Sequence, residues 1–159
     1  MNRDRPLRVC YVLAYRAPDY IRTQSILTAL RQMPGVELRT AINTSTGSKR
    51  YIETLKAASV IAKEKWADVY ILGFRGHELY WPLRMIAGRK PIIFDAMMSP
   101  FAALREESKH GLPGIMASGI VHLLEKRILQ DSHTVLTDTE LHARYFSKEF
   151  GIPERKIAA

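Results

Sequence analysis

Short apolar runs alternate with helical stretches along the chain, and this alternation constrains the fold more than any other feature. Each run is read as apolar with little alternation, as expected for a strand that is buried on both faces of a sheet. The runs lie at residues 8–14, 36–42, 68–73, 91–95 and 134–137. Strands that alternate with helices pair in parallel through right-handed crossovers. The sequence therefore predicts an α/β fold, with a doubly wound, mostly parallel sheet and helices on both faces.

Helical periodicity fills the gaps between these runs. The expected buried stripes are Ile26, Leu27, Leu30 and Met33; Leu55, Ser59, Ala62 and Trp66; and Ile120, Leu123, Leu124 and Ile128. We expect a polar loop at residues 43–49 and a break in the long helical region at residues 110–114. Thr137 with Glu140 fits a capping box before a last helix. Residues 156–159 resemble the approach to a further strand that has no room to form.

The composition limits the classes of partner. The 159 residues fit one domain, and 24 Lys and Arg against 16 Asp and Glu give a net charge of +8. This excess favours anionic partners such as phosphorylated ligands, acidic lipid headgroups or nucleic acid. The single cysteine, Cys10, lies in the first apolar run and is expected to be a core thiol. With no signal peptide and no apolar run of about 18 residues, we expect a cytoplasmic protein and leave attachment to a membrane surface open.

Polar, reactive residues follow four of the expected strands, at residues 15–19, 75–78, 95–99 and 138–140. In an open α/β sheet, ligands bind where loops converge at the carboxyl ends of the strands. The last of these clusters is expected only to cap its own helix. The other three predict one wall of a binding cleft.

Two of these clusters carry arginine. Arg16 is a candidate anion contact, although Arg16, Asp19 and Arg22 also fit a helix start with an Asp cap and a solvated ion pair. Arg75 and His77 could hold a phosphate or sugar hydroxyls, and His77 could move a proton. The alternative for this second cluster is a polar loop that starts a helix.

The third cluster contains a carboxylate and a hydroxyl. Asp95 closes an apolar strand and needs hydrogen bonds from loop amides, a hydroxyl or a substrate. Ser99 is either a contact of the same site or a helix cap. A separate segment, Tyr80–Met85 followed by Arg89 and Lys90, mixes aromatic, apolar and basic side chains as interfacial segments do. Core packing explains its apolar members equally well.

Several common sites do not fit the sequence. No glycine-rich turn follows the first strand, which argues against an NAD or FAD domain. The five histidines lack metal-binding spacing, so we predict no metal and no cofactor. There is no G-x-S-x-G hydrolase motif, and no recognition motif supports a specific nucleic-acid partner. The first strand also lacks the acidic pair of a receiver domain.

The order of elements, residues 88–95 and above all residues 134–159 resemble the N-terminal domain of bacterial GT-B glycosyltransferases of the family 4 kind. In that family a segment like Thr137-Asp138-Thr139-Glu140 precedes a helix, and a stretch like residues 150–157 then leads into the second domain. The resemblance covers essentially the whole chain. It implies that residues 1–159 form a single Rossmann-like, acceptor-side domain, with the C-terminal donor-binding domain absent.

The resemblance also implies an enzyme of the hexosyltransferase type. The complete protein would move a sugar from a nucleotide-sugar donor to a hydroxyl of a sugar or lipid-linked acceptor, in the assembly of cell-surface polysaccharide or glycolipid. Arg16, Arg75, His77, Asp95 and Ser99 are then the candidate acceptor or sugar contacts, with His77 and Asp95 as candidates for a catalytic base. This chain alone would be inactive, and an anionic membrane surface is a further candidate partner. The alternative is a non-catalytic acceptor- or membrane-docking subunit that works with a separate donor-binding chain.

Overall fold

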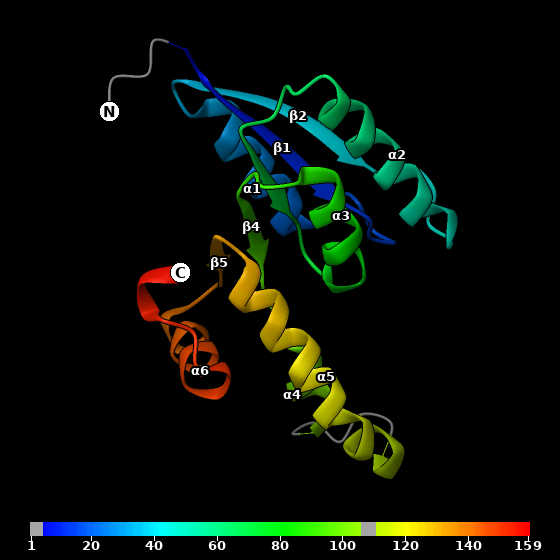
Figure 1. The fold of residues 1–159 in the computed structure, drawn as a ribbon, viewed down its shortest axis with the longest axis vertical. Coiled ribbons are helices and arrows are strands. Elements are labelled where there is room, and N and C mark those ends of the chain that lie inside the picture. Colours follow the sequence, from blue (N-terminus) through cyan, green and yellow to red (C-terminus); the bar gives the residue numbers. More distant parts are fainter. Residues whose placement is uncertain (1–4, 106–110) are drawn as a thin grey trace. The chain divides into compact units, whose positions relative to one another are not determined.

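A computed structural model describes residues 5–105 and 111–159 (Figure 1). The chain divides into two compact units, Met1–Asp95 and Ala96–Ala159. Parallel strands and helices make up both units, so the predicted α/β class is confirmed.

The first unit contains a sheet of four parallel strands in the order β2-β1-β3-β4. The strands are β1 (Leu7–Leu13), β2 (Val36–Ile42), β3 (Val69–Leu72) and β4 (Ile92–Asp95). β1 and β3 are central and largely buried, as predicted. The expected burial on both faces is wrong for β2, where only Ala41 is buried, because this strand pairs with β1 alone and forms an edge.

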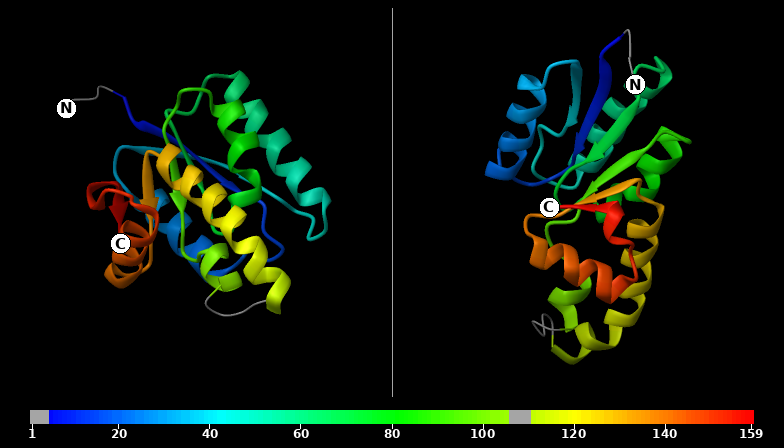
Figure 2. Two further views of the ribbon diagram at one scale, coloured as in Figure 1. Left: turned by 60° about the horizontal axis from the view of Figure 1, so that its bottom comes forward. Right: turned by 90° about the vertical axis from the view of Figure 1, so that its left-hand side faces the viewer.

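Helices cover both faces of this sheet. α1 (Ile21–Gln32) lies on one side of the strands, and α2 (Lys49–Lys63) and α3 (Tyr80–Ala87) lie on the other (Figure 2). The first unit therefore has the doubly wound, Rossmann-like arrangement that the sequence predicts. The buried positions of α2 differ from the predicted stripe by one residue: they are Thr54, Ala58 and Ile61. The Thr54 hydroxyl donates to the Leu13 carbonyl (2.8 Å), which turns this face toward the sheet.

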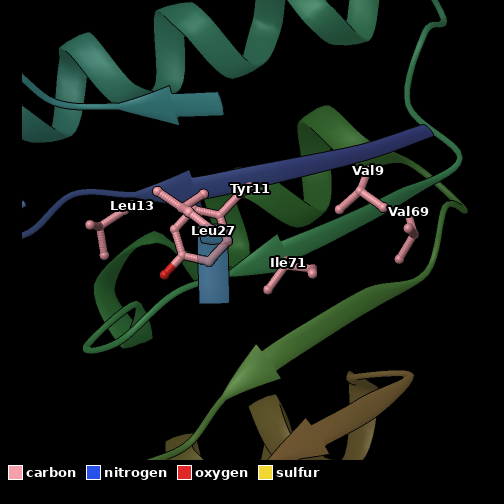
Figure 3. Close-up of a cluster of buried hydrophobic side chains, with 6 residues drawn as sticks. All are labelled: Val9, Tyr11, Leu13, Leu27, Val69 and Ile71. Carbon is pink, nitrogen blue, oxygen red and sulfur yellow. The ribbon is translucent and has the colours of Figure 1, made fainter. Parts of the chain in front are cut away.

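Alternate residues of β1 build the core beneath α1. Val9, Tyr11 and Leu13 point to the same face as Val69 and Ile71 of β3, and Leu27 of α1 packs against them (Figure 3). The Tyr11 ring is fully buried, and this burial raises the pKa of its hydroxyl to about 12. Cys10 on the same strand is a buried free thiol, as predicted.

The second unit combines three helices with a pair of short parallel strands. Its elements are α4 (Pro100–Arg105), α5 (Gly111–Asp131), β5 (Thr134–Leu136), α6 (Glu140–Phe150), the 3₁₀ helix η2 (Glu154–Lys156) and β6 (Ile157–Ala158). β5 pairs with β6, so the expectation that residues 156–159 have no room for a strand is wrong. A two-residue strand needs only the Val135–Ile157 and Leu136–Ala158 pairings.

Two local expectations in this unit need correction. Thr139, rather than Thr137, caps α6, and its hydroxyl accepts from the His142 N–H (3.2 Å). The capping box is therefore not formed. The predicted break at residues 110–114 falls partly outside the described residues. Pro113 and Gly114 lie in the first turn of α5, where proline is tolerated because its missing N–H needs no partner.

α5 buries a different face from the one that its apolar periodicity predicts. Ile128 is buried, but Ile120, Leu123 and Leu124 are exposed. The buried residues of the helix are Gly114, Ser118, Glu125, Ile128 and Leu129. The predicted stripe is wrong for three of its four members, because α5 turns a carboxylate toward the start of α4. Among the described residues, none of the helices combines the length and hydropathy that crossing a membrane would require.

Candidate functional site

Aromatic contacts bring together the loops that follow β1 and β3. The Phe74 ring meets Tyr15 edge-on, with 5.2 Å between ring centroids, and stacks on Tyr20 at 5.5 Å. Tyr15 and Tyr20 belong to the β1 loop, and Phe74 belongs to the β3 loop. The shared ring cluster therefore holds both loops at the carboxyl edge of the sheet, next to each other.

Buried polar side chains fix the backbone of the β1 loop. Asn43, directly after β2, accepts from the Tyr15 N–H (2.9 Å) and donates to the Tyr15 carbonyl (2.8 Å). The same amide donates to the Ser45 carbonyl (2.8 Å). Because one side chain satisfies three backbone groups, it holds the loop in one conformation. The backbone at Tyr15, directly before Arg16, is therefore fixed.

These loops enclose a small polar pocket of about 190 Å³. It is lined by Ala14, Tyr15, Arg16, Arg50, Tyr51, Arg75 and Glu78. The structure thus brings together two of the predicted site residues, Arg16 and Arg75. Sequence reasoning missed Arg50 and Tyr51 as site residues; both belong to the first turn of α2.

Positive charge dominates this pocket. The residues that line it include three arginines, Arg16, Arg50 and Arg75, and one carboxylate residue, Glu78. The Arg50 guanidinium lies over the Tyr51 ring at 4.2 Å and donates to the Tyr51 hydroxyl (2.6 Å). Within the described part of the chain, Arg16 and Arg75 form no hydrogen bond or ion pair. Their donors are therefore available to an anionic ligand.

The backbone at Arg75 is strained. Its φ angle is +59°, in the left-handed region that favours glycine. The next residue, Gly76, is fixed by packing, because a Cβ there would lie 2.4 Å from Cγ of Leu72. The loop therefore holds Arg75 in a conformation that an arginine does not favour.

His77 does not line this pocket. It begins the 3₁₀ helix η1 (His77–Leu79), and its ring packs edge-on against Phe94 at 4.9 Å. Burial, together with the charge of Arg75, lowers the pKa of His77 to about 4. The imidazole is therefore neutral at physiological pH and a weak base, which weakens the hypothesis that it moves a proton.

Asp95 also lies outside the pocket, in a buried ion pair. Arg22 donates from Nε and Nη2 to its two carboxylate oxygens, with N–O distances of 2.7–2.9 Å. The Asp95 side chain is fully buried, and that of Arg22 is 19% exposed. The alternative of an Asp cap for α1 is wrong, because Tyr20 is the residue before the helix and makes no side-chain cap bond. Arg22 pairs with Asp95 rather than forming a solvated pair.

Ser99 takes part in a separate polar cluster in the second unit. Its hydroxyl accepts from the Ala102 N–H (3.1 Å) as the cap of α4 and donates to Glu125 (2.9 Å). Glu125 also accepts from the Phe101 N–H (3.1 Å). Burial raises the pKa of Glu125 to about 7, although these two hydrogen bonds partly oppose the shift.

Ser99 also lines an open, mainly apolar cavity of about 550 Å³ with residues of α6. Sequence reasoning missed Glu125. The feature that could have indicated its burial is its place as an acidic residue among the apolar residues Leu123, Leu124 and Ile128. The structure thus gives Ser99 the capping role that was its alternative, and contact with a ligand stays a prediction.

Comparisons with known proteins add no constraint to this geometry. A scan against models of protein families finds no matching model, and a search among curated proteins finds no match. Among the described residues, no group of three or more His, Cys, Asp and Glu side chains is arranged to hold a metal ion.

We predict that Arg22→Ala destabilises the first unit by roughly 3–5 kcal/mol, because it leaves the buried Asp95 carboxylate without its counter-charge. Urea unfolding monitored by circular dichroism measures this free energy. The matched control is Arg5→Ala, which removes an exposed partner of Asp68 and should change the unfolding midpoint far less. Equal effects of the two substitutions would contradict a structural role for the buried pair.

We predict that Glu125→Gln removes a pH dependence of stability. The folded-state pKa of about 7 lies above the ordinary value of 4.5, so the folded chain keeps this proton longer than the unfolded chain. Stability should therefore fall as pH rises from about 4.5 to 7. Glutamine keeps the hydrogen-bond acceptor without the charge, so the variant should match the parent near pH 5. At pH 8 it should be more stable by an amount on the order of 3 kcal/mol.

Unfolding midpoints at the two pH values test this expectation, with the exposed Glu140→Gln as control. A Glu125→Gln variant that is no more stable than the parent at pH 8 would show that the carboxylate is ionised at little cost.

Proposed function

We propose that this chain is the acceptor-binding lobe of a GT-B glycosyltransferase, which moves a sugar from a nucleotide-sugar donor to an acceptor hydroxyl. The observation that carries the proposal is the arginine pocket at the carboxyl edge of a doubly wound sheet, the edge where folds of this class bind ligands. The resemblance to family 4 enzymes supports the same assignment. A second, donor-binding domain would complete the enzyme.

The residues of the first unit divide into two roles under this proposal. Arg16 and Arg75 contact the acceptor, because both line the pocket and neither has a hydrogen-bond partner among the described residues. Asp95 is a positioning residue, because its carboxylate holds Arg22 and thereby the start of α1. His77 supports the loop of Arg75 through its contact with Phe94. No residue of this chain is assigned as the catalytic base.

We predict that transfer by the full-length protein, assayed by mass spectrometry with a panel of nucleotide sugars and acceptors, depends on both pocket arginines. Arg16→Ala and Arg75→Ala should each raise the acceptor KM by about tenfold or more, since a hydrogen bond to a charged group contributes about 1.5–3 kcal/mol. Donor KM should change little, and the exposed Arg31→Ala is the matched control.

Two outcomes would contradict this proposal. Undiminished transfer by both variants would remove the pocket from acceptor binding. Transfer that appears only after a separate donor-binding chain is mixed in would favour the alternative of a non-catalytic subunit.

Attachment to an anionic membrane surface is a second candidate function, favoured by the exposed face of α5. Residues 111–124 contain no Lys, Arg, Asp or Glu, and Lys126 and Arg127 follow them. The exposed apolar side chains of this helix are Leu112, Ile115, Met116, Ile120, Leu123 and Leu124. Exposed apolar side chains beside basic residues favour contact with the interface of an anionic bilayer. The predicted interfacial segment at Tyr80–Met85 exposes Trp81 and Met85 and is the competing contact.

Cosedimentation with vesicles separates these contacts. We predict that the protein binds vesicles rich in phosphatidylglycerol more strongly than vesicles of phosphatidylcholine. Met116→Glu should reduce this binding severalfold, because it places a charge on the α5 face. Met85→Glu is the matched control, since both methionines are 84% exposed. Loss of binding with Met85→Glu alone would assign the contact to α3.

A further inference from the structure

The arginine pocket of the first unit has more positive charge than its own residues balance. Arg16, Arg50 and Arg75 face one carboxylate, which leaves two positive charges in excess. Like charges held near one another are unfavourable unless an anion neutralises them. An excess of this size matches a doubly charged anion better than a single carboxylate.

The donors of the pocket suit tetrahedral phosphate oxygens. Guanidinium groups present planar forks of N–H donors, which bind phosphate through paired, charge-assisted hydrogen bonds. Arg16 and Arg75 come from different loops and have no hydrogen-bond partner among the described residues, so both forks are available. Arg50 is held in place by the Tyr51 ring and by the carbonyl of Gly47 (3.0 Å). One guanidinium is thus preorganised, which lowers the entropic cost of binding.

The size of the pocket limits the ligand. Its volume of about 190 Å³ lies below the roughly 300–1,000 Å³ of sites for drug-sized molecules. This volume suits one phosphate with part of a sugar ring. Tyr15 and Tyr51 in the lining offer aromatic surface to such a ring. A whole nucleotide would extend beyond this volume.

We propose that this pocket binds the phosphate group of a phosphorylated sugar that serves as the acceptor. Phosphate recognition follows from the arginines alone, whereas the role of the sugar phosphate as acceptor rests on the proposed function. The strained backbone of Arg75 agrees with this assignment. Glycine would relieve the strain, but only a cationic side chain supplies the charge.

The test is a calorimetric titration of the 159-residue chain with inorganic phosphate, with glucose 6-phosphate and its uncharged parent glucose, and with UDP. We expect glucose 6-phosphate to bind at least about tenfold more tightly than glucose. Phosphate itself should compete with it. Equal binding of glucose and glucose 6-phosphate would overturn the proposal. Tighter binding of UDP than of glucose 6-phosphate would assign the pocket to the donor and overturn the acceptor assignment.

Arg75→Gly is the decisive variant, because it removes the charge and the strain together. It should weaken glucose 6-phosphate binding by about tenfold or more, while its melting temperature stays equal to or above that of the parent. Arg75→Lys should bind with intermediate affinity, and Arg31→Ala on α1 should bind like the parent. Equal losses with Arg31→Ala and Arg75→Gly would show attraction by net charge alone and overturn the site.

Binding and transfer separate this inference from the proposed function. If glucose 6-phosphate binds through Arg75 but no nucleotide sugar is consumed by the full-length protein, the phosphate site stands and its acceptor role falls. If transfer proceeds to unphosphorylated acceptors only, and glucose 6-phosphate does not bind, the proposed function stands and this inference falls.

Discussion

The buried ion pair between Arg22 and Asp95 is the contact on which the carboxyl edge of the first unit depends. A carboxylate removed from water is tolerated only when a counter-charge and hydrogen bonds replace its hydration. The guanidinium comes from the first turn of α1, so this helix must start where Arg22 can reach the end of β4. The loop between Leu13 and Ile21 therefore spans a fixed gap. Arg16 lies in this loop. The ion pair between Arg22 and Asp95 therefore helps to position it, although Arg16 takes no part in that pair.

The sequence predicted the strands well and the buried faces of the helices poorly, for one physical reason. Central parallel strands are apolar along most of their length, and the predicted runs at residues 8–14 and 68–73 overlap β1 and β3. Periodicity, however, counts apolar side chains only. The buried faces of α2 and α5 include Thr54 and Glu125, which satisfy backbone groups of other segments. A hydrophobic pattern does not record such polar contacts. The predicted buried positions of α2 and α5 therefore differ from the observed ones.

The same limit applies to the site. The rule that ligands bind at the carboxyl ends of parallel strands singled out Arg16 and Arg75, and both line one pocket. It could not find Arg50, which reaches the pocket from the start of a helix. It also could not pair Arg22 with Asp95, which are 73 positions apart in the chain. Such a pairing depends on how the connections between strands bring distant segments together. The sequence around either residue therefore does not predict it.

The backbone conformation of Arg75 bears on the role proposed for its loop. A non-glycine residue in the left-handed region is strained by about 1 kcal/mol or more, and it persists only where the surroundings impose it. Here Leu72 occupies the space that a Cβ at Gly76 would need, so packing fixes the turn. If the loop served only to join β3 to η1, glycine at this position would make the same turn without strain. Under the proposed phosphate site, the charge of Arg75 is the reason for an arginine at this strained position.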